Sequence, residues 1–182
     1  MQRIASIEPA NAQGQSKELL DAVKSKLGIV PNLTKVMANE PAVLNGYLSF
    51  SGALAGGTFD AKTREALALA VAGANSCGYC ASAHSAISKN LKVPEDEITR
   101  RLTGHASDPK LDAALVFARQ VVAKKGLVSD ADMSAVRAAG NSDAEIVEII
   151  GNVVLNLLTN YINHVADTAI DFPVVDAAPY RA

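Results

Sequence analysis

The chain has 182 residues, about the length of one domain. Its 17 Lys and Arg residues nearly balance its 19 Asp and Glu residues, which argues against a general nucleic-acid backbone binder, since such a protein carries a basic excess. Hydrophobic residues make up 49% of the sequence, too many for a disordered chain, whereas two cysteines are too few for a disulfide scaffold.

The N-terminal part of the sequence is typical of consecutive helices. Apolar residues have helical spacing over residues 19–27, and Gly28 ends that run. A short helix is expected around residues 33–37. Pro41 suits the first turn of the next helix, which we expect over residues 41–54.

The following two helices bring together the residues of greatest chemical interest. Asp60 can cap a helix that continues to about Ala74 and is unusually rich in alanine. Because small side chains permit close approach between helices, we expect this helix to be central and buried. Ser76 is expected to cap the helix that covers residues 77–90.

The C-terminal half also predicts only helices. Pro94 and Pro109 each open one, and the pairs Ser129/Asp132 and Ser142/Glu145 have the spacing of capping boxes. No segment alternates at period two for long, so no sheet is expected. We therefore predict a single all-α domain over residues 1–182, a bundle of about seven to nine helices.

The last predicted helix is long, and we expect it to reach Ile170. A wide apolar stripe on it suits either the core of a bundle or a contact between subunits. The residues of this stripe are Ile146, Ile149, Ile150, Val153, Val154, Leu157 and Leu158.

Neither a targeting segment nor a membrane-spanning segment is expected. Residues 1–17 are polar and lack the apolar stretch of a signal peptide, and the longest apolar runs are too short to span a bilayer. The sequence therefore predicts a cytoplasmic protein, without a membrane or nucleic-acid partner. In that compartment a structural disulfide is rare, so the two thiols are expected to be redox-active or metal-bound.

Two cysteines and a histidine share one helical face. At about 100° of rotation per residue, Cys77, Cys80 and His84 fall within an arc roughly 60° wide. With Ser76 as the cap, Cys77 would lie in the first turn, where the positive end of the helix favours a thiolate. Cys80 lies one turn from the imidazole of His84, which can act as its base. Thiolate attack needs such a combination, so a redox dithiol is the leading interpretation.

Two other interpretations of these residues remain open. The cysteines can be inert, or can form part of a zinc site with His84 and a fourth ligand such as His164, although no second CxxC pair supports that site. Glu65, on the preceding helix, is either an ordinary exposed acid of a first turn or a buried carboxylate that accepts protons.

The spacing of these residues resembles a family signature. Glu65, eleven residues, Cys77-x-x-Cys80, three residues and His84 are similar to the motif of alkyl hydroperoxidase D (AhpD)-like proteins, in the carboxymuconolactone decarboxylase superfamily. Softer similarities to its peroxidase-related branch lie at Gly28–Leu33, at Asn160-Tyr161-x-Asn163-His164 and at Asp171-Phe172-Pro173. The resemblance implies an all-helical, homo-oligomeric thiol peroxidase with no cofactor and no metal. It also implies a hydroperoxide substrate and an external dithiol reductant, either a lipoyl protein or a thioredoxin-like protein.

The resemblance also implies roles for individual residues. Cys80 would be the peroxidatic thiol, Cys77 the resolving thiol that faces the reductant, and His84 and Glu65 the proton relay. On physical grounds alone the two thiols stay ambiguous, because the helix terminus favours Cys77 whereas the histidine favours Cys80. Tyr79 stands where well-studied family members have a histidine, and tyrosine titrates too high to replace that base.

His164 and Asn160 are possible supporting residues, in structural hydrogen bonding or at an interface. Two other functions remain as alternatives. One is a lactone decarboxylase of the type found in other branches of the superfamily, and the other is a non-enzymatic redox or zinc-binding helical module.

Overall fold

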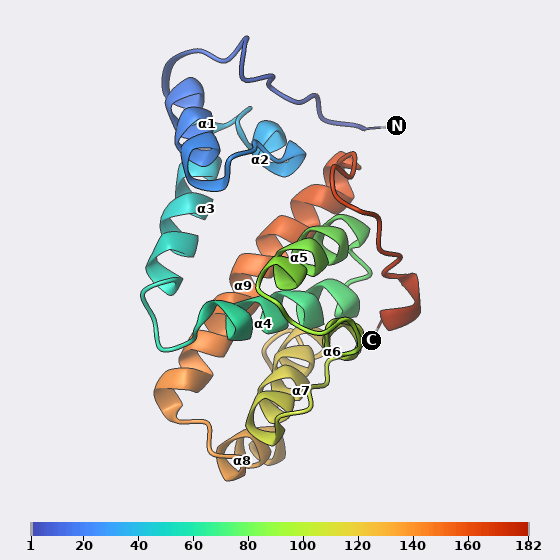
Figure 1. The fold of residues 1–182 in the computed structure, drawn as a ribbon. Helices are drawn as coiled ribbons and strands as arrows, with labels where there is room; N and C mark the ends of the chain where they lie inside the picture. Colours follow the sequence, from blue (N-terminus) through green and yellow to red (C-terminus); the bar gives the residue numbers. More distant parts are fainter. Residues whose placement is uncertain (1, 182) are drawn as a thin grey trace.

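The computed structural model describes residues 2–181, and within this range every regular element is helical, as predicted (Figure 1). Nine α-helices and one short 3₁₀-helix follow one another along these residues. They are α1 (Gly14–Leu27), α2 (Asn32–Met37), α3 (Pro41–Leu54), α4 (Ala61–Ala74), α5 (Gly78–Asn90), α6 (Glu95–Leu102), α7 (Pro109–Ala123), α8 (Asp130–Ala138), α9 (Asp143–Ala166) and η1 (Ala178–Tyr180).

Helix α4 is the centre of the molecule, as its small residues indicated. Every residue from Ala66 to Ala74 is buried, and α4 packs against α5, α6, α7 and α9. Gly73 permits the closest approach, because a Cβ atom there would lie 2.0 Å from the carbonyl oxygen of Leu102 in α6. One side of α4 contributes to a hydrophobic cluster with α1, α2 and α5, and the other side to a cluster with α7, α8 and α9.

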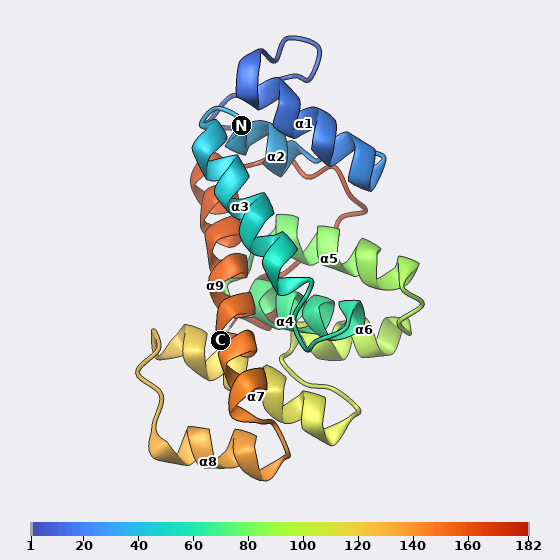
Figure 2. The same cartoon turned by 90° about the vertical axis from the view of Figure 1, so that its left-hand side faces the viewer.

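Helix α9 spans most of the length of the molecule, from α8 at one end to α2 at the other (Figures 1 and 2). By length and composition alone it could cross a membrane, but 44% of the residues in its most apolar window are buried inside this domain. A core helix of a soluble bundle has the same composition, so this property does not by itself indicate a membrane protein.

The start of α5 differs from the prediction. The N-cap is Cys77, not Ser76, because Ser76 instead ends α4 in the left-handed conformation, at a φ of 54°. The backbone N–H of Cys77 donates to the carbonyl of Ala72 and that of Ser76 to Gly73, which is the hydrogen-bond pattern of a Schellman motif. Cys77 therefore precedes the first turn of α5.

The last helix is shorter than predicted. It ends at Ala166, because Asp167 adopts a left-handed conformation with a φ of 50°, and the N–H of Thr168 returns to the carbonyl of Asn163. The following segment, residues 168–177, crosses back over the N-terminal end of α5. Its Val175 N–H donates to Ser82 Oγ at 2.9 Å, and Ile170 packs beside Gly78. We call residues 168–177 the C-terminal strap.

Candidate active site

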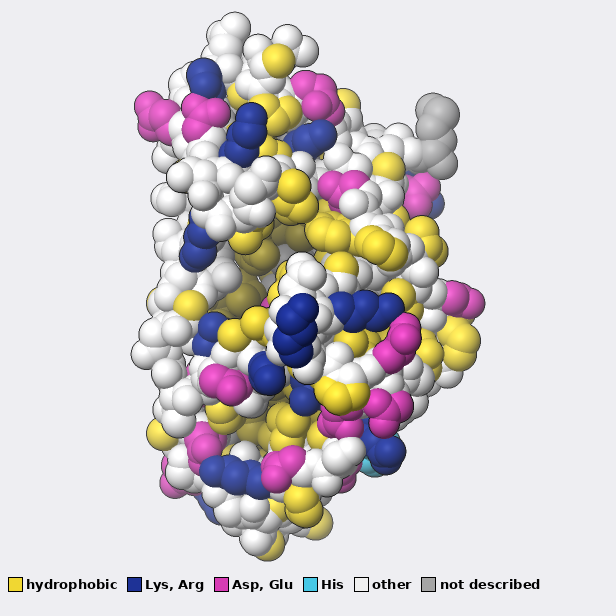
Figure 3. All heavy atoms as spheres, in the orientation of Figure 1, with side chains coloured by type: hydrophobic (Ala, Val, Ile, Leu, Met, Phe, Trp, Pro, Cys, Tyr) yellow, Lys and Arg dark blue, Asp and Glu magenta, His cyan; other side chains and the backbone are white. Residues whose placement is uncertain are grey.

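A cavity of about 470 Å³ lies between α3 and α5 and contains most of the predicted site residues. Glu65, Cys80 and His84 line it, together with Tyr79. Its other walls are largely apolar and come from α1, α2, α3 and α9. Figure 3 shows the hollow between α3 and α5, with hydrophobic side chains on its walls.

Glu65 and His84 form an ion pair at the edge of this cavity. His84 Nδ1 lies 2.7 Å from Glu65 Oε2, and the two side chains are 21% and 17% exposed. The sequence left Glu65 as either an exposed acid or a buried carboxylate. The structure shows a partly buried carboxylate. Burial lowers the pKa of His84, but the charge and hydrogen bond of Glu65 and the charge of Cys80 outweigh burial and raise it. This arrangement favours an imidazolium beside a carboxylate.

Cys80 has the properties of an activated thiol. Its side chain is 2% exposed, and Asn163 Nδ2 donates to Cys80 Sγ at 3.3 Å. A hydrogen bond from the Cys77 side chain, the charge of His84 and the contacts of Asn163 and Thr159 outweigh burial and lower the pKa of Cys80 to about 6. Cys80 is therefore favoured as a thiolate at neutral pH.

Cys77 has the opposite properties. It is fully buried, it does not line the cavity, and it packs in one cluster with Phe172, Val175 and Ala177 of the C-terminal strap. The hydrogen bond that it shares with Cys80, together with burial and the charge of Cys80, holds the pKa of Cys77 far above its usual range. The N–H groups of Tyr79 and Cys80 at the helix terminus lower the pKa of Cys77, but the three opposing effects outweigh them, so Cys77 is not the more acidic thiol. In this conformation the strap covers Cys77, so the thiol is not exposed to a reductant; its predicted role as the resolving thiol stays a prediction.

Both cysteines are free thiols, so this is the reduced form of the pair. Their side chains are hydrogen-bonded to each other, although Cys77 is the cap and Cys80 lies within the first turn. The predicted proximity of the two thiols therefore holds, although the assumed helical position of Cys77 does not.

Tyr79 links three segments instead of facing the thiols as a base. Its hydroxyl donates to Asp171 Oδ1 at 2.8 Å and accepts from the N–H of Leu33 at 3.1 Å, while its ring packs edge-to-face on Phe172. Burial raises the pKa of Tyr79, so the phenol stays protonated. Tyr79 thus attaches the C-terminal strap and the start of α2 to the CxxC turn.

The other two predicted supporting residues do not touch Cys80 or the cavity. His164 lies on the exposed side of α9. Asn160 is fully buried, and its Oδ1 accepts a hydrogen bond of 3.0 Å from Asn75 at the end of α4. Asn160 therefore connects α9 to the segment that precedes Cys77.

Three residues of the site were not assigned to it from the sequence. Asn163 and Thr159 on α9 contact Cys80, Thr159 Oγ1 at 3.9 Å from the sulfur. Tyr47 of α3 lines the cavity near Cys80 and Glu65, and burial together with these two negative charges raises its pKa to about 12. The sequence did contain one signal for Asn163: several Asn residues recur at helical spacing on a largely apolar helix.

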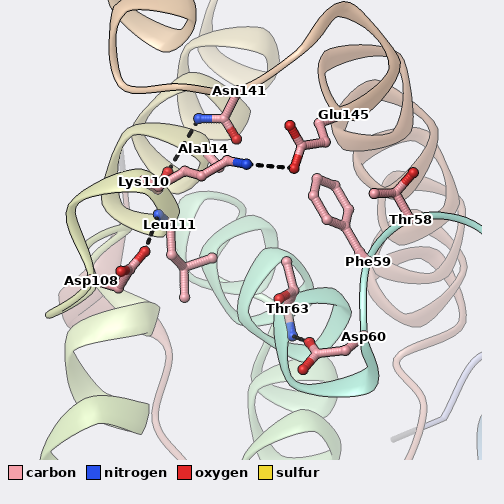
Figure 4. Close-up of a pocket in the computed structure, with 10 residues that line it drawn as sticks. All are labelled: Thr58, Phe59, Asp60, Thr63, Asp108, Lys110, Leu111, Ala114, Asn141 and Glu145. Carbon is pink, nitrogen blue, oxygen red and sulfur yellow. Dashed lines mark hydrogen bonds and ion pairs between the residues drawn. The ribbon is translucent and has the colours of Figure 1, made fainter.

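A second hollow, of about 290 Å³, lies where the N-terminal ends of α4, α7 and α9 meet (Figure 4). It contains none of the predicted site residues. Its acids are already engaged in local structure, since Asp60 and Asp108 cap α4 and α7, and Glu145 binds Lys110 at 2.7 Å. This hollow therefore has a structural role, and the thiol-lined cavity is the candidate active site.

The zinc arrangement considered from the sequence is not formed. Across residues 2–181, no group of three or more His, Cys, Asp and Glu side chains is arranged to hold a metal ion. His84 is paired with Glu65, and His164 points away from the thiols on the outer side of α9.

Comparisons with known proteins agree with this fold. Residues 41–124 match the carboxymuconolactone decarboxylase family. The structure resembles an AhpD-core, peroxidase-related protein from Ralstonia eutropha JMP134, at 24% identity over 93% of this chain and 92% of that one, with a TM-score of 0.83. A peroxidase-related protein from Silicibacter sp. TM1040 has a TM-score of 0.80, at 21% identity over 99% and 94% of the two chains.

A third similar structure is a cysteine-to-alanine variant of the debrominase Bmp8 in complex with 2,3,4-tribromopyrrole. It has a TM-score of 0.76 at 17% identity, over 92% of this chain and 91% of that one. A search of curated proteins found no match.

The fold and site define a class of helical proteins in which a CxxC pair lies beside a carboxylate–imidazole pair. Residues 41–124, a little under half of the chain, match the carboxymuconolactone decarboxylase family, and the chain shares the fold of the AhpD-core and peroxidase-related structures.

Proposed function

We propose that the protein is a thiol-dependent peroxidase that reduces hydrogen peroxide or organic hydroperoxides through Cys80 and Cys77. The single observation that carries this proposal is the lowered pKa of Cys80 at the wall of a cavity that also contains the Glu65–His84 pair. A thiolate beside a proton donor is the combination that cleavage of an O–O bond requires.

In the proposed reaction, the Cys80 thiolate attacks the terminal oxygen of the hydroperoxide. The S–O bond forms as the O–O bond breaks, so Cys80 becomes a sulfenic acid and the leaving alkoxide takes a proton from the His84 imidazolium. Glu65 holds the His84 ring by its Nδ1 atom and stabilises the positive charge before transfer. The Cys77 thiol then condenses with the sulfenic acid, which forms the disulfide and releases water.

The cycle closes when an external dithiol, such as a lipoyl or thioredoxin-like protein, reduces the disulfide to two thiols. Cys77 would be the sulfur that this reductant attacks, so the C-terminal strap would have to move from the N-terminal end of α5. A cytoplasmic setting would suit this cycle, because its thiol pool keeps such pairs reduced.

The test is peroxide consumption by the purified protein with a dithiol donor. We expect Cys80→Ser to abolish consumption, whereas Cys77→Ser should consume one equivalent of peroxide and then stop. Mass spectrometry of the wild type after one equivalent should find the Cys77–Cys80 disulfide. Full turnover by Cys80→Ser would refute the proposed assignment of the two thiols.

The relay has its own test. Glu65→Gln removes the carboxylate that raises the pKa of His84, so less imidazolium is available to protonate the alkoxide. We expect slower peroxide consumption near neutral pH. Glu95→Gln, an exposed acid paired only with Lys89, is the matched control and should keep the wild-type rate.

Reductive dehalogenation is a second candidate, favoured by the debrominase neighbour and by a cavity far larger than hydrogen peroxide needs. A dithiol can convert an aryl bromide to the arene, with bromide and one proton released as the thiols become a disulfide. Bromide release from a bromopyrrole, without peroxide consumption, would favour this candidate. A decarboxylase or a zinc-binding module would instead show neither reaction, and one tight zinc ion per chain would identify the latter.

A further inference from the structure

One hydroxyl on the wall of the thiol cavity has no hydrogen-bond partner. Tyr47 of α3 lines this cavity, and its side chain is only partly exposed. Across residues 2–181 no group is hydrogen-bonded to its Oη atom. Ser85 Oγ and Asn160 Nδ2 also lack partners but are sealed in the interior of the domain, whereas the Tyr47 hydroxyl is not sealed. The hydroxyl is therefore open to the cavity.

Tyr47 is also the phenol of this wall that can still donate a hydrogen bond to a ligand. The other one, Tyr79, already donates to Asp171 and accepts from the N–H of Leu33. Burial and the neighbouring negative charges raise the pKa of Tyr47 to about 12, so its hydroxyl keeps its proton throughout the neutral range. The cavity therefore contains one neutral donor whose hydrogen no protein group uses.

Tyr47 lies opposite the reacting groups of the site. The charges that act on it are those of Cys80, the proposed nucleophile, and of Glu65, which holds His84. Tyr47 belongs to α3, whereas Cys80 and His84 belong to α5, and the hollow in Figure 3 lies between these two helices. A molecule in the cavity would therefore have a phenol on one side and a thiolate and an imidazolium on the other.

Cleavage of an O–O bond needs donors at the oxygen that leaves, because negative charge develops there. A preorganised donor aimed at this oxygen stabilises the transition state more than it stabilises the bound substrate. Glu65 holds Nδ1 of His84, which leaves Nε2 as the ring atom that can serve the substrate. A second donor on the opposite wall would fix the direction of the O–O bond relative to the attacking sulfur.

We infer that Tyr47 is a further catalytic residue, whose hydroxyl donates a hydrogen bond to the departing oxygen of the hydroperoxide while Cys80 Sγ attacks the terminal oxygen. This inference rests on the proposed peroxidase reaction and leaves its balance unchanged. The S–O bond forms, the O–O bond breaks, and Cys80 is oxidised as the hydroperoxide is reduced. His84 supplies the proton to the alkoxide, and Tyr47 keeps its own proton.

The test compares two reactions of Cys80 in the wild type and in Tyr47→Phe. This change removes only the unpartnered hydroxyl, so the variant should fold as the wild type does. Reduced protein with one equivalent of cumene hydroperoxide and no external reductant, quenched and followed by mass spectrometry, reports O–O cleavage. Alkylation by iodoacetamide reports the thiolate alone, since no oxygen leaves. We expect cleavage to slow by about 10²-fold, as when one donor to a developing oxyanion is removed, and alkylation at every pH to stay unchanged.

Tyr161→Phe is the matched control for this comparison. Tyr161 is a phenol on α9 that is 56% exposed and does not line the cavity. Both reactions of this variant should have the wild-type rate. A loss of cleavage equal to that of Tyr47→Phe would contradict a specific role of Tyr47.

The leaving group provides a readout that a merely structural role of Tyr47 would not change. Peracetic acid releases acetate, which is stable as an anion at neutral pH and does not need a donor. Tyr47→Phe should therefore slow the reaction with peracetic acid much less than the reaction with cumene hydroperoxide. Equal slowing with both peroxides would mean that the substitution distorts the site, and would overturn the inference.

The remaining outcomes separate this inference from the proposed function. If neither peroxide oxidises the wild type, the peroxidase proposal fails and this inference fails with it. If the wild type is oxidised and Tyr47→Phe keeps the wild-type rate with cumene hydroperoxide, the inference alone fails. It also fails if the alkylation profile of Cys80 moves to another pH in Tyr47→Phe, because the hydroxyl would then act on the thiol and not on the substrate.

Discussion

At the scale of single residues, the two thiols of one CxxC motif differ because of their surroundings. Cys80 accepts hydrogen bonds from Cys77 and Asn163 and faces the imidazolium of His84, whereas Cys77 donates its hydrogen bond to Cys80 and otherwise packs in an apolar cluster. The helix terminus, which favoured Cys77 in the sequence, still lowers the pKa of that thiol through the N–H groups of Tyr79 and Cys80, but the hydrogen bond to Cys80, burial and the charge of Cys80 outweigh this effect.

The pH dependence of Cys80 reactivity tests this asymmetry. Because the pKa of Cys80 is lowered to about 6, its thiolate persists well below the usual range of a cysteine. We expect the rate of Cys80 alkylation by iodoacetamide, followed by peptide mass spectrometry, to be half of its maximum near pH 6 and level above about pH 7. Below pH 6 the rate should fall with the thiolate fraction. An inflection near pH 8 or 9 would contradict the assigned ionisation.

Asn163 provides a matched test of one contact. Asn163→Leu removes the N–H that donates to the sulfur at nearly constant volume, so we expect the inflection of the Cys80 alkylation profile to move to higher pH. Asn156→Leu is the control, since Asn156 is also buried on α9 but donates to the carbonyl of Asn152. An equal shift in both variants would mean that general polarity, and not the hydrogen bond, sets the pKa.

At the scale of helices, the position of the thiols depends on how α4 packs. Gly73 allows α4 to approach α6, and a Cβ atom there would overlap the carbonyl of Leu102. We expect Gly73→Ala to lower the free energy of unfolding by about 1–3 kcal/mol, as overpacking does. The control Gly52→Ala, in an open position on α3, should raise it by about 0.4–1 kcal/mol. Urea denaturation of both variants measures the two signs.

The C-terminal strap controls access to Cys77 in this structure. Asp171 accepts hydrogen bonds from Tyr79 and from the N–H of Asn32, both at 2.8 Å, and so fastens the strap to α5 and α2. We expect Asp171→Ala to speed alkylation of Cys77 severalfold by loosening the strap, whereas Asp176→Ala, which loses only a local bond to Ala178, should not. Unchanged protection of Cys77 in Asp171→Ala would show that the strap is held by its apolar contacts instead.

At the scale of the whole molecule, local signals were sufficient for most of the fold. Capping boxes at Ser129 and Ser142, first-turn prolines and helical periodicity act within a few residues, and the helices predicted from them are present. Two helix boundaries were predicted wrongly, the start of α5 at Ser76 and the end of α9 at Asp167. At both positions a non-glycine residue adopts a left-handed conformation. Side-chain type does not specify that conformation, because tertiary packing stabilises it.

The residue types of the site and their spacing were also readable along the chain, since Glu65, Cys80 and His84 lie on two consecutive helices. Only three-dimensional packing decided which thiol is acidic, that Asn163 and Tyr47 approach it, and that the strap covers Cys77. It also divided the apolar stripe of α9, placing Ile149 in the core and Val154 on the surface. Ionisation and burial depend on neighbours distant in sequence, and a local pattern carries no information about those neighbours.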